Sequence, residues 1–220
     1  MDINAYRPDE FPPFKVTVAP ATEPVSTAEA RAWVRQDTTA DDSTITILIA
    51  AARDWVETHT HRALITQTRR AFIPQWPDDD APILLPGGNV STTPSDTVVE
   101  YRNDAGTWTV LATSEYELEA ATEDAPAKIW PSLSAGAWPK LSLGLVGDDR
   151  RRQGVGFETR GAIRITYVAG YGLAAAVPQP LRQAVLLHVG WYYDHRNEPM
   201  GDDHFQALHR LIHPFRLTAF

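Results

Sequence analysis

The sequence predicts an α+β protein in which N-terminal and C-terminal helix pairs form a small helical bundle and an antiparallel β-rich region is inserted between them. Apolar residues recur at helical spacing near both ends of the chain, whereas the middle alternates polar and apolar residues between turn signals. We therefore expect an extended proline-rich arm at 1–24, a helical bundle made of 25–62 and 178–220, and a β-rich insertion at 63–177.

The composition supports a hydrophobic core and excludes several kinds of site. Hydrophobic residues make up 43% of the 220 residues. The chain has no cysteine, which excludes disulfides, thiolate metal sites and a cysteine nucleophile. The formal charge of −8 argues against a broad nucleic-acid-binding surface, since phosphate binding relies on clustered Lys and Arg. No apolar run approaches the roughly 20 residues that a bilayer span needs, so we expect a soluble protein without a membrane partner.

The first 24 residues contain little periodicity, which is typical of an extended arm. Phe11, Phe14 and Val16 within the arm indicate that it docks on the rest of the protein. The same segment carries five prolines, which also favour an extended arm: Pro8, Pro12, Pro13, Pro20 and Pro24.

Two helices are expected after the arm. In "STAE", Ser26 can cap a helix while Glu29 reaches back to it, which is a capping box. The second helix begins near Asp41 or Asp42, whose carboxylates suit the positive end of the helix dipole, and it runs to about Thr60. Its apolar stripe faces one partner layer and consists of Ile45, Leu48, Ile49, Ala52, Trp55, Val56 and His59.

The stretch "LIAAARDWVETHTHRALITQT" changes from helical to strand periodicity. His61 and Arg62 are expected to end the helix, and from Leu64 an alternation of period two predicts a strand. Further strands are expected in "TVVEYRNDAGTWTVL", which reads as two strands about a turn, and in the pair "EYELEA" and "AKIWP". "GAIRITYVAGYG" is the clearest strand. "PDDDAPILLPGGN" is expected to be a loop and residues 147–156 a long polar lobe.

A third helix is expected in "VPQPLRQAVLLHVGWYYDHRNEP", and it is apolar nearly all round. Its apolar residues cannot all face one small bundle, so some of them are expected at a subunit or partner interface. The candidates are Leu186, Leu187, Trp191 and Tyr193. A last helix is expected at about Asp202 to Ile212.

The C-terminal segment "HRLIHPFRLTAF" is a second candidate interface. Beyond Pro214 it cannot continue as a regular helix, yet its apolar residues alternate with polar ones. We expect this tail to dock on a neighbouring molecule, with folding back onto the bundle as the alternative. The candidate interface residues are Phe215, Arg216, Leu217 and Phe220.

Histidines are the obvious candidates for a catalytic or metal site. His209 and His213 have i, i+4 spacing, which puts both on one helical face. No HExxH motif, cysteine or nearby carboxylate completes a site, so we predict no catalytic residue, no cofactor and no bound metal. His59 is expected to be a core-edge histidine that hydrogen-bonds backbone. The acidic runs at 78–80 and 148–149, and the basic run at 150–152, are expected to be solvated surface.

Four of these stretches occur in an order that resembles a known family. They are the "DD" helix start, "LIAAARDWVETHTHRALITQT", "IRITYVAGYG" and "VPQPLRQAVLLHVGWYYDHRNEP". From about Val25 to the C-terminus the chain is similar to the head-tail connector (adaptor) proteins of long-tailed bacteriophages, prophages and gene transfer agents. Relatives commonly carry a glycine as the helix C-cap where His61 stands in this chain, and the 147–156 lobe has no counterpart.

The resemblance implies a non-enzymatic structural protein of the virion, assembled in the bacterial cytoplasm and located at the head-tail junction. Such proteins form a ring of twelve copies beneath the portal protein and extend the DNA channel. The next tail-proximal component, a stopper or tail-terminator protein, binds the ring. Genomic DNA passes through the ring without sequence-specific binding, and the acidic balance of the chain suits such a channel.

Two other functions are kept as alternatives. The first, within the same class, is a head-tail stopper or tail-completion protein, which also forms a ring but lies one layer further down. The second is a histidine-metal hydrolase or a β-rich ligand-binding module. Bound metal, or an aromatic-lined pocket in the β-rich region, would favour this second class.

Overall fold

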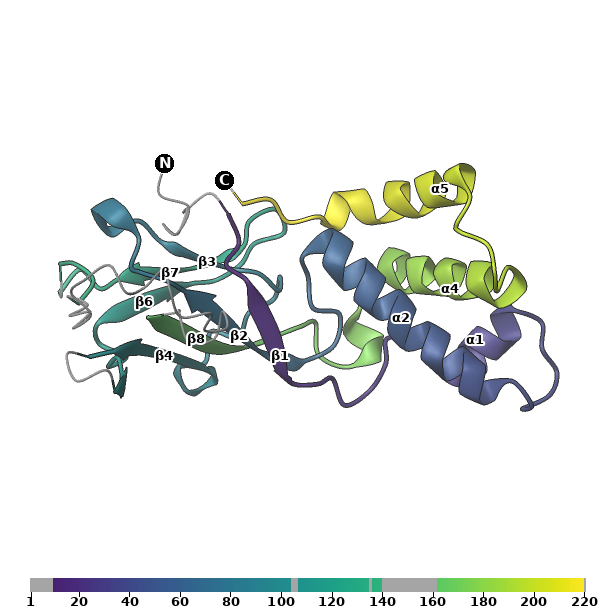
Figure 1. Cartoon of the computed structure of the whole chain (residues 1–220), viewed down its shortest axis with the longest axis horizontal. Helices are drawn as coiled ribbons and strands as arrows, with labels where there is room; N and C mark the ends of the chain where they lie inside the picture. The colour runs from purple at the N-terminus through teal and green to yellow at the C-terminus, as the bar shows by residue number, and fades with distance from the viewer. Residues whose placement is uncertain (1–9, 104–106, 135, 140–161, 220) are drawn as a thin grey trace, which may run out of the picture. The chain divides into compact units, whose positions relative to one another are not determined.

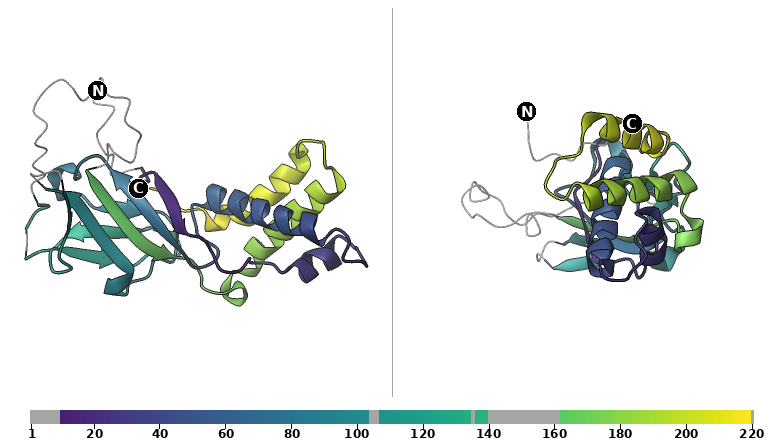
Figure 2. Two further views of the ribbon diagram at one scale, coloured as in Figure 1. Left: turned by 60° about the horizontal axis from the view of Figure 1, so that its bottom comes forward. Right: turned by 90° about the vertical axis from the view of Figure 1, so that its right-hand side faces the viewer.

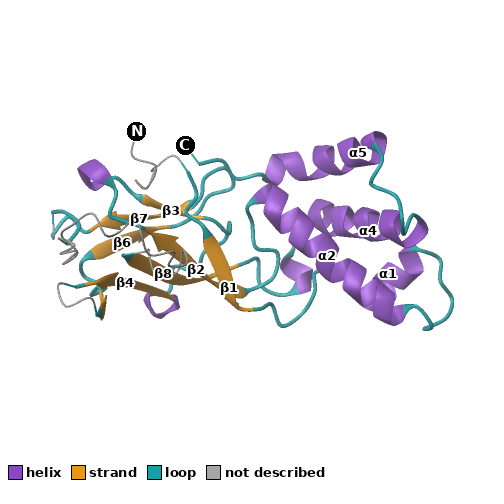
Figure 3. Cartoon of the chain, viewed as in Figure 1, coloured by secondary structure: helices purple, strands orange, loops and turns teal. Residues whose placement is uncertain are grey.

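The computed structural model describes residues 10–103, 107–134, 136–139 and 162–219, which form two compact units (Figure 1). The β unit consists of residues 1–19, 68–169 and 218–220, and the helical unit consists of residues 20–67 and 170–217. Helices and antiparallel sheets are both present, which confirms the predicted α+β class (Figure 3).

The helical unit contains α1 (Thr27–Trp33), α2 (Asp42–Thr60), α4 (Gln179–Asp194) and α5 (Asp202–Ile212), with 3₁₀ turns at Ala174–Ala176 and His213–Phe215. Helix α4 contacts α1, α2 and α5 (Figure 2). Together these elements bury one aliphatic core, made of Val25, Ala30, Ile45, Ile49, Ala52, Val56, Leu64, Ile65, Val177, Leu181, Ala184, Val185, Val189, Leu208 and Ile212. None of the helices in the described ranges is long and apolar enough to span a bilayer.

Local signals set the helix ends as the sequence predicts. The Ser26 Oγ accepts a hydrogen bond from the Glu29 N–H at 3.2 Å, and the Glu29 carboxylate accepts one from the Ser26 N–H at 2.8 Å. The bond from the Ser26 backbone is the main reason that the pKa of Glu29 is lowered. At the other end of α2, His61 adopts the left-handed conformation with φ of 57°, a geometry that glycine adopts at the lowest cost.

The β unit contains two sheets. The larger has the order β1-β2-β8-β4-β5, with β1 (Phe14–Val18), β2 (Gln67–Ile73), β8 (Ile163–Ala169), β4 (Thr97–Arg102) and β5 (Trp108–Val110). The smaller has the order β3-β7-β6, with β3 (Ile83–Leu85), β7 (Ala127–Pro131) and β6 (Tyr116–Glu119). The predicted pairings of β4 with β5 and of β6 with β7 are confirmed. Short 3₁₀ turns at Asp78–Asp80 and Pro94–Asp96 interrupt the strands.

The two sheets share an interior. In β8 the residues at alternate positions, from Ile163 to Ala169, are buried and those between them are half-buried. Tyr116 of the smaller sheet donates its hydroxyl to the Thr97 carbonyl of the larger sheet at 3.0 Å. Tyr167 of β8 donates its hydroxyl to the Pro86 carbonyl, just after β3, at 2.7 Å. The side of each sheet that carries these tyrosines is therefore its inner face.

The N-terminal arm joins the larger sheet as an edge strand. β1 pairs with β2 in antiparallel register, and the Arg69 guanidinium lies over the Phe14 ring at 4.5 Å from its centroid. All five residues of β1 are exposed, because nothing in the described part of the chain covers the outer edge of the strand.

Candidate interaction surfaces

More of the apolar residues of α4 are buried within the helical unit than the sequence indicates. Leu186, Leu187 and Tyr193 are partly buried against the aliphatic core. Trp191 is half-buried and its ring stacks on His195 with the centroids 4.1 Å apart. Three helices surround α4, so apolar residues on most of its circumference pack within the unit. Whether any of them also contacts a partner stays a prediction.

The tail after α5 folds back on the helical unit as far as Leu217. The Leu217 N–H donates to the Thr60 carbonyl at 3.0 Å, and the Arg62 Nε donates to the Phe215 carbonyl. Leu217 is only 1% exposed and Phe215 packs against the core. These two residues therefore fold back onto the helical unit, which was the alternative, and docking of the tail on a neighbouring molecule stays a prediction. Arg216 is exposed, and Phe220 lies outside the described residues.

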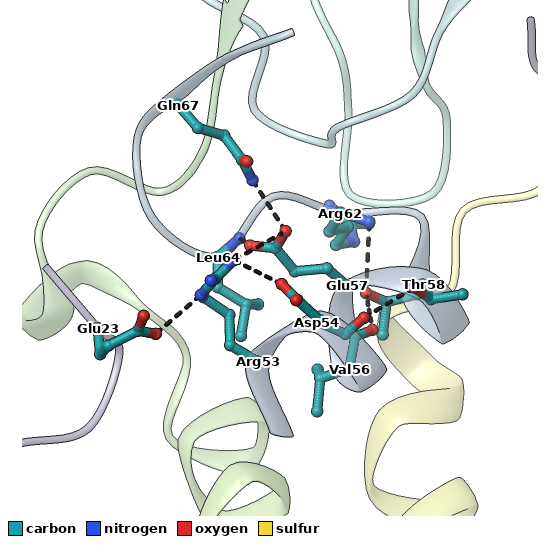
Figure 4. Close-up of polar contacts among 10 residues, drawn as sticks. Glu23, Arg53, Asp54, Val56, Glu57, Thr58, Arg62, Leu64 and Gln67 are labelled. Carbon is teal, nitrogen blue, oxygen red and sulfur yellow. Dashed lines mark hydrogen bonds and ion pairs between the residues drawn. The ribbon is translucent and has the colours of Figure 1, made fainter. Parts of the chain in front are cut away.

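The end of α2 holds a buried carboxylate in a network of donors (Figure 4). Glu57 is 8% exposed, and it accepts hydrogen bonds from the Leu64 N–H at 2.8 Å and from the Gln67 Nε2 at 2.9 Å. The Arg53 Nη1 lies 3.8 Å from the Glu57 Oε2, and the Arg53 Nε lies 2.8 Å from the Glu23 Oε2. Charge-assisted hydrogen bonds thus hold the segment after α2 against the end of that helix, and the polar groups of the junction stabilise the fold.

Histidines from three helices gather around Trp55. The rings of His59 and Trp55 stack with centroids 3.9 Å apart, and those of His209 and His188 lie 5.9 and 5.5 Å from Trp55. The His59 Nδ1 lies 2.7 Å from the Trp55 carbonyl, as expected of a core-edge histidine. Burial, reinforced by His204 and His59, lowers the pKa of His188 to about 4. Burial likewise lowers the pKa of His209.

This histidine cluster has no metal-site geometry. His213 is exposed, and its partner in the i, i+4 pair, His209, faces the ring of His59 at a centroid distance of 5.5 Å. Within the described ranges, no group of three or more His, Cys, Asp or Glu residues could hold a metal ion. The absence of metal and of catalysis stays a prediction. Asp78 and Asp80 are exposed, whereas the acidic run at 148–149, the basic run at 150–152 and the 147–156 lobe lie outside the described residues.

The larger sheet carries a basic surface that is not apparent from the sequence. Strand register puts four cationic residues on its outer face, opposite the buried side chains: Lys15 lies beside Arg70, Arg164 beside Glu100, and Arg102 beside Trp108. The Trp108 ring lies between the guanidinium groups of Arg102 and Arg164, at 4.8 and 4.2 Å. We call this surface, formed by Lys15, Arg70, Arg102, Trp108, Val110 and Arg164, the basic face.

The smaller sheet carries carboxylates on its outer face. Glu117 and Glu119 of β6 are exposed, and Trp130 of β7 lies beside Glu117 and donates its Nε1 to Glu119 at 2.7 Å. A hollow of about 430 Å³ lies at this surface and is lined by Asp80, Glu117, Trp130, Pro131, Ser132, Leu133 and Gly136. We call this surface, formed by Asp80, Glu117, Glu119, Trp130 and Leu133, the acidic face. The alternation of charged residues along the strands is visible in the sequence, but the strand order that brings them together is not.

Solved structures share this fold over nearly the whole chain. A chain of the neck of the empty GTA particle, computed with C6 symmetry, is 23% identical with a TM-score of 0.73, and the similarity covers 94% of this chain and 97% of that one. A chain of the virion of the native gene transfer agent (GTA) particle is 25% identical with a TM-score of 0.71, over 94% and 96% of the two chains. A chain of the neck of the native GTA particle, computed with C12 symmetry, is 25% identical with a TM-score of 0.64, over 93% and 97%. No protein-family model matches the sequence, and neither does any curated protein.

Proposed function

We propose that this protein is a structural head-tail connector (adaptor) in the neck of a tailed phage or phage-like particle. The observation that carries the proposal is the similarity to a virion chain and two neck chains of GTA particles, which spans 93–94% of this chain. Because the likeness covers both units, it concerns the whole architecture and not one common domain.

In this role the protein forms a ring beneath the portal protein, extends the DNA channel and offers a surface to the stopper or tail-terminator protein. Two of the similar chains come from necks computed with C6 and C12 symmetry, which supports a ring of twelve copies. Genomic DNA crosses the ring without sequence-specific binding, and the net charge of −8 suits such a channel. The ring assembles in the bacterial cytoplasm and needs no cofactor.

The exposed part of the tail is the proposed contact with the portal. Arg216 is exposed while its neighbours Phe215 and Leu217 pack on the helical unit, so the tail presents a cation on a rigid support. Trp191, half-buried at the surface of α4, is the second candidate contact. Arg216→Glu is expected to weaken attachment to portal-bearing heads while thermal stability stays unchanged.

The proposal is tested by imaging particles made in cells where a tagged full-length chain replaces the native copy. We expect a ring of labelled density directly below the portal, and untailed heads when the gene is deleted. Labelled density one layer further from the head would identify a stopper or tail-completion protein instead. A chain absent from purified particles would overturn the structural role altogether.

A further inference from the structure

We propose that neighbouring copies in the ring contact one another through the β unit, with the basic face of one copy against the acidic face of the next. This inference rests on the proposed ring function and names the surfaces that build it. Neither surface follows from the similarity to other neck chains, because it depends on side chains of this sequence.

The two faces are placed as a ring requires. The tyrosines that fill the interior, Tyr116 and Tyr167, point from each sheet toward the other, so the outer faces lie on opposite sides of the β unit. A cyclic ring is built from head-to-tail contacts, in which two different and complementary surfaces of each copy meet. One face on each side of the same unit satisfies this condition for any number of copies.

The charges of the two faces are complementary. The basic face carries Lys15, Arg70, Arg102 and Arg164, and the carboxylate beside them, Glu100, accepts from Arg164 at 2.6 Å. The acidic face carries Asp80, Glu117 and Glu119, with Lys128 lying 3.7 Å from Glu119. This separation of charge attracts the basic face of one copy to the acidic face of another. It makes contact between two basic or two acidic faces unfavourable. It therefore favours a ring over back-to-back dimers.

Each face also exposes apolar side chains near its charges. On the acidic face Leu133 is 90% exposed and Trp130 is 37% exposed, both at the rim of the 430 Å³ hollow. On the basic face Val110, which lies opposite Glu100 in the sheet, is 61% exposed. Apolar anchors surrounded by charged residues are typical of protein-protein contacts. A basic or apolar side chain of the neighbouring copy fits a hollow that has both carboxylates and an apolar wall.

The absence of cysteine from the sequence allows a clean crosslinking test. Cells expressing Val110→Cys and Leu133→Cys chains together should yield particles in which a short bismaleimide joins the two variants. Particles that contain only one variant should give no crosslinked dimer, because each contact joins unlike faces. Ile47→Cys is the matched control, since Ile47 is 69% exposed on the helical unit, and it should not crosslink to either variant.

A charge exchange tests the electrostatic part. Arg70→Glu and Glu117→Lys should each lower the yield of the Val110-to-Leu133 crosslink by about tenfold. The two substitutions in one chain should restore most of it, because each contact again joins unlike charges. Unchanged thermal unfolding of the single variants will show that the fold is intact.

The outcomes separate the two proposals. Neck rings that contain the chain but give no crosslink between Val110→Cys and Leu133→Cys copies would overturn the inference and leave the connector function standing. A double charge exchange that fails to restore the crosslink would also count against it. Particles that lack the chain would instead overturn the proposed function.

Discussion

The two units use their polar side chains in opposite ways. In the helical unit the carboxylate of Glu57 and the imidazole of His188 are buried, with exposed fractions of 8% and 5%. In the β unit one charged side chain, Arg69, is buried beneath Phe14, and the other described charges of the larger sheet lie on its outer face. Substitution of the buried Glu57 should therefore cost stability, whereas substitution of a charge on an outer face of the β unit should cost assembly.

The largest expected effect is in the helical unit. Glu57→Ala should lower the free energy of unfolding by about 3–5 kcal/mol, because it leaves two buried donors, the Leu64 N–H and the Gln67 Nε2, without their charged acceptor. Chemical denaturation followed by the helical circular dichroism signal measures the loss. Glu117→Ala, at an exposed carboxylate of the β unit, is the control and should change stability by less than about 0.5 kcal/mol. Equal losses in both variants would contradict the comparison.

Acid should weaken the helical unit before the β unit. Burial lowers the pKa of His188 to about 4, below its ordinary value of 6.5, so the unfolded chain binds a proton that the folded chain rejects. The free energy of unfolding is therefore highest above pH 6.5. It falls by about 3 kcal/mol in total as the pH drops to 4. Denaturation at a series of pH values should show this slope, and His188→Gln should remove most of it. A slope that is the same in His188→Gln would place its origin elsewhere.

A smaller effect is expected from the interior of the β unit. Tyr167 is fully buried and donates its hydroxyl to the Pro86 carbonyl at 2.7 Å, and burial raises the pKa of that hydroxyl. Tyr167→Phe should cost about 1–2 kcal/mol, because the carbonyl loses its donor in a site that water does not reach. Thermal unfolding of the β unit measures this loss. An unchanged midpoint would mean that the carbonyl finds another donor.

The sequence predicts the helical unit better than the β unit. Helix ends are set by nearby residues, whereas strand order is set by contacts between distant segments. The capping box at Ser26 and the ends of α2 and α5 follow from residues within a few positions, so the sequence predicts them. The β4–β5 and β6–β7 pairs have short connections and were predictable for the same reason. The position of β8 between β2 and β4 joins segments far apart in the chain, since Arg70 of β2 and Thr166 of β8 are 96 residues apart and β4 is about 70 residues from β8, and no local pattern specifies it.

The sequence does not show how much of each candidate interface the helical unit itself covers. The sequence shows that α4 is apolar on most sides, but not that α1, α2 and α5 surround it. It shows the alternating tail, but not that the Thr60 carbonyl accepts from Leu217. The basic and acidic faces cannot be predicted from local patterns, because strand order and register bring their residues together. Burial and surface charge are properties of the assembled sheet.

The smallest expected effect is at His61, just after the end of α2, in the segment of chain that leads to β2. His61 holds a left-handed conformation with φ of 57°, which costs a residue with a side chain roughly 1 kcal/mol and costs glycine almost nothing. His61→Gly should therefore be more stable than His61→Ala by about 1 kcal/mol, since both variants lose the imidazole and differ only in the backbone preference. The comparison of these two variants by chemical denaturation removes any contribution of the histidine side chain itself. If the alanine variant proved equal to or more stable than the glycine variant, the left-handed end of α2 would not be a strained position, and histidine there would cost the fold nothing.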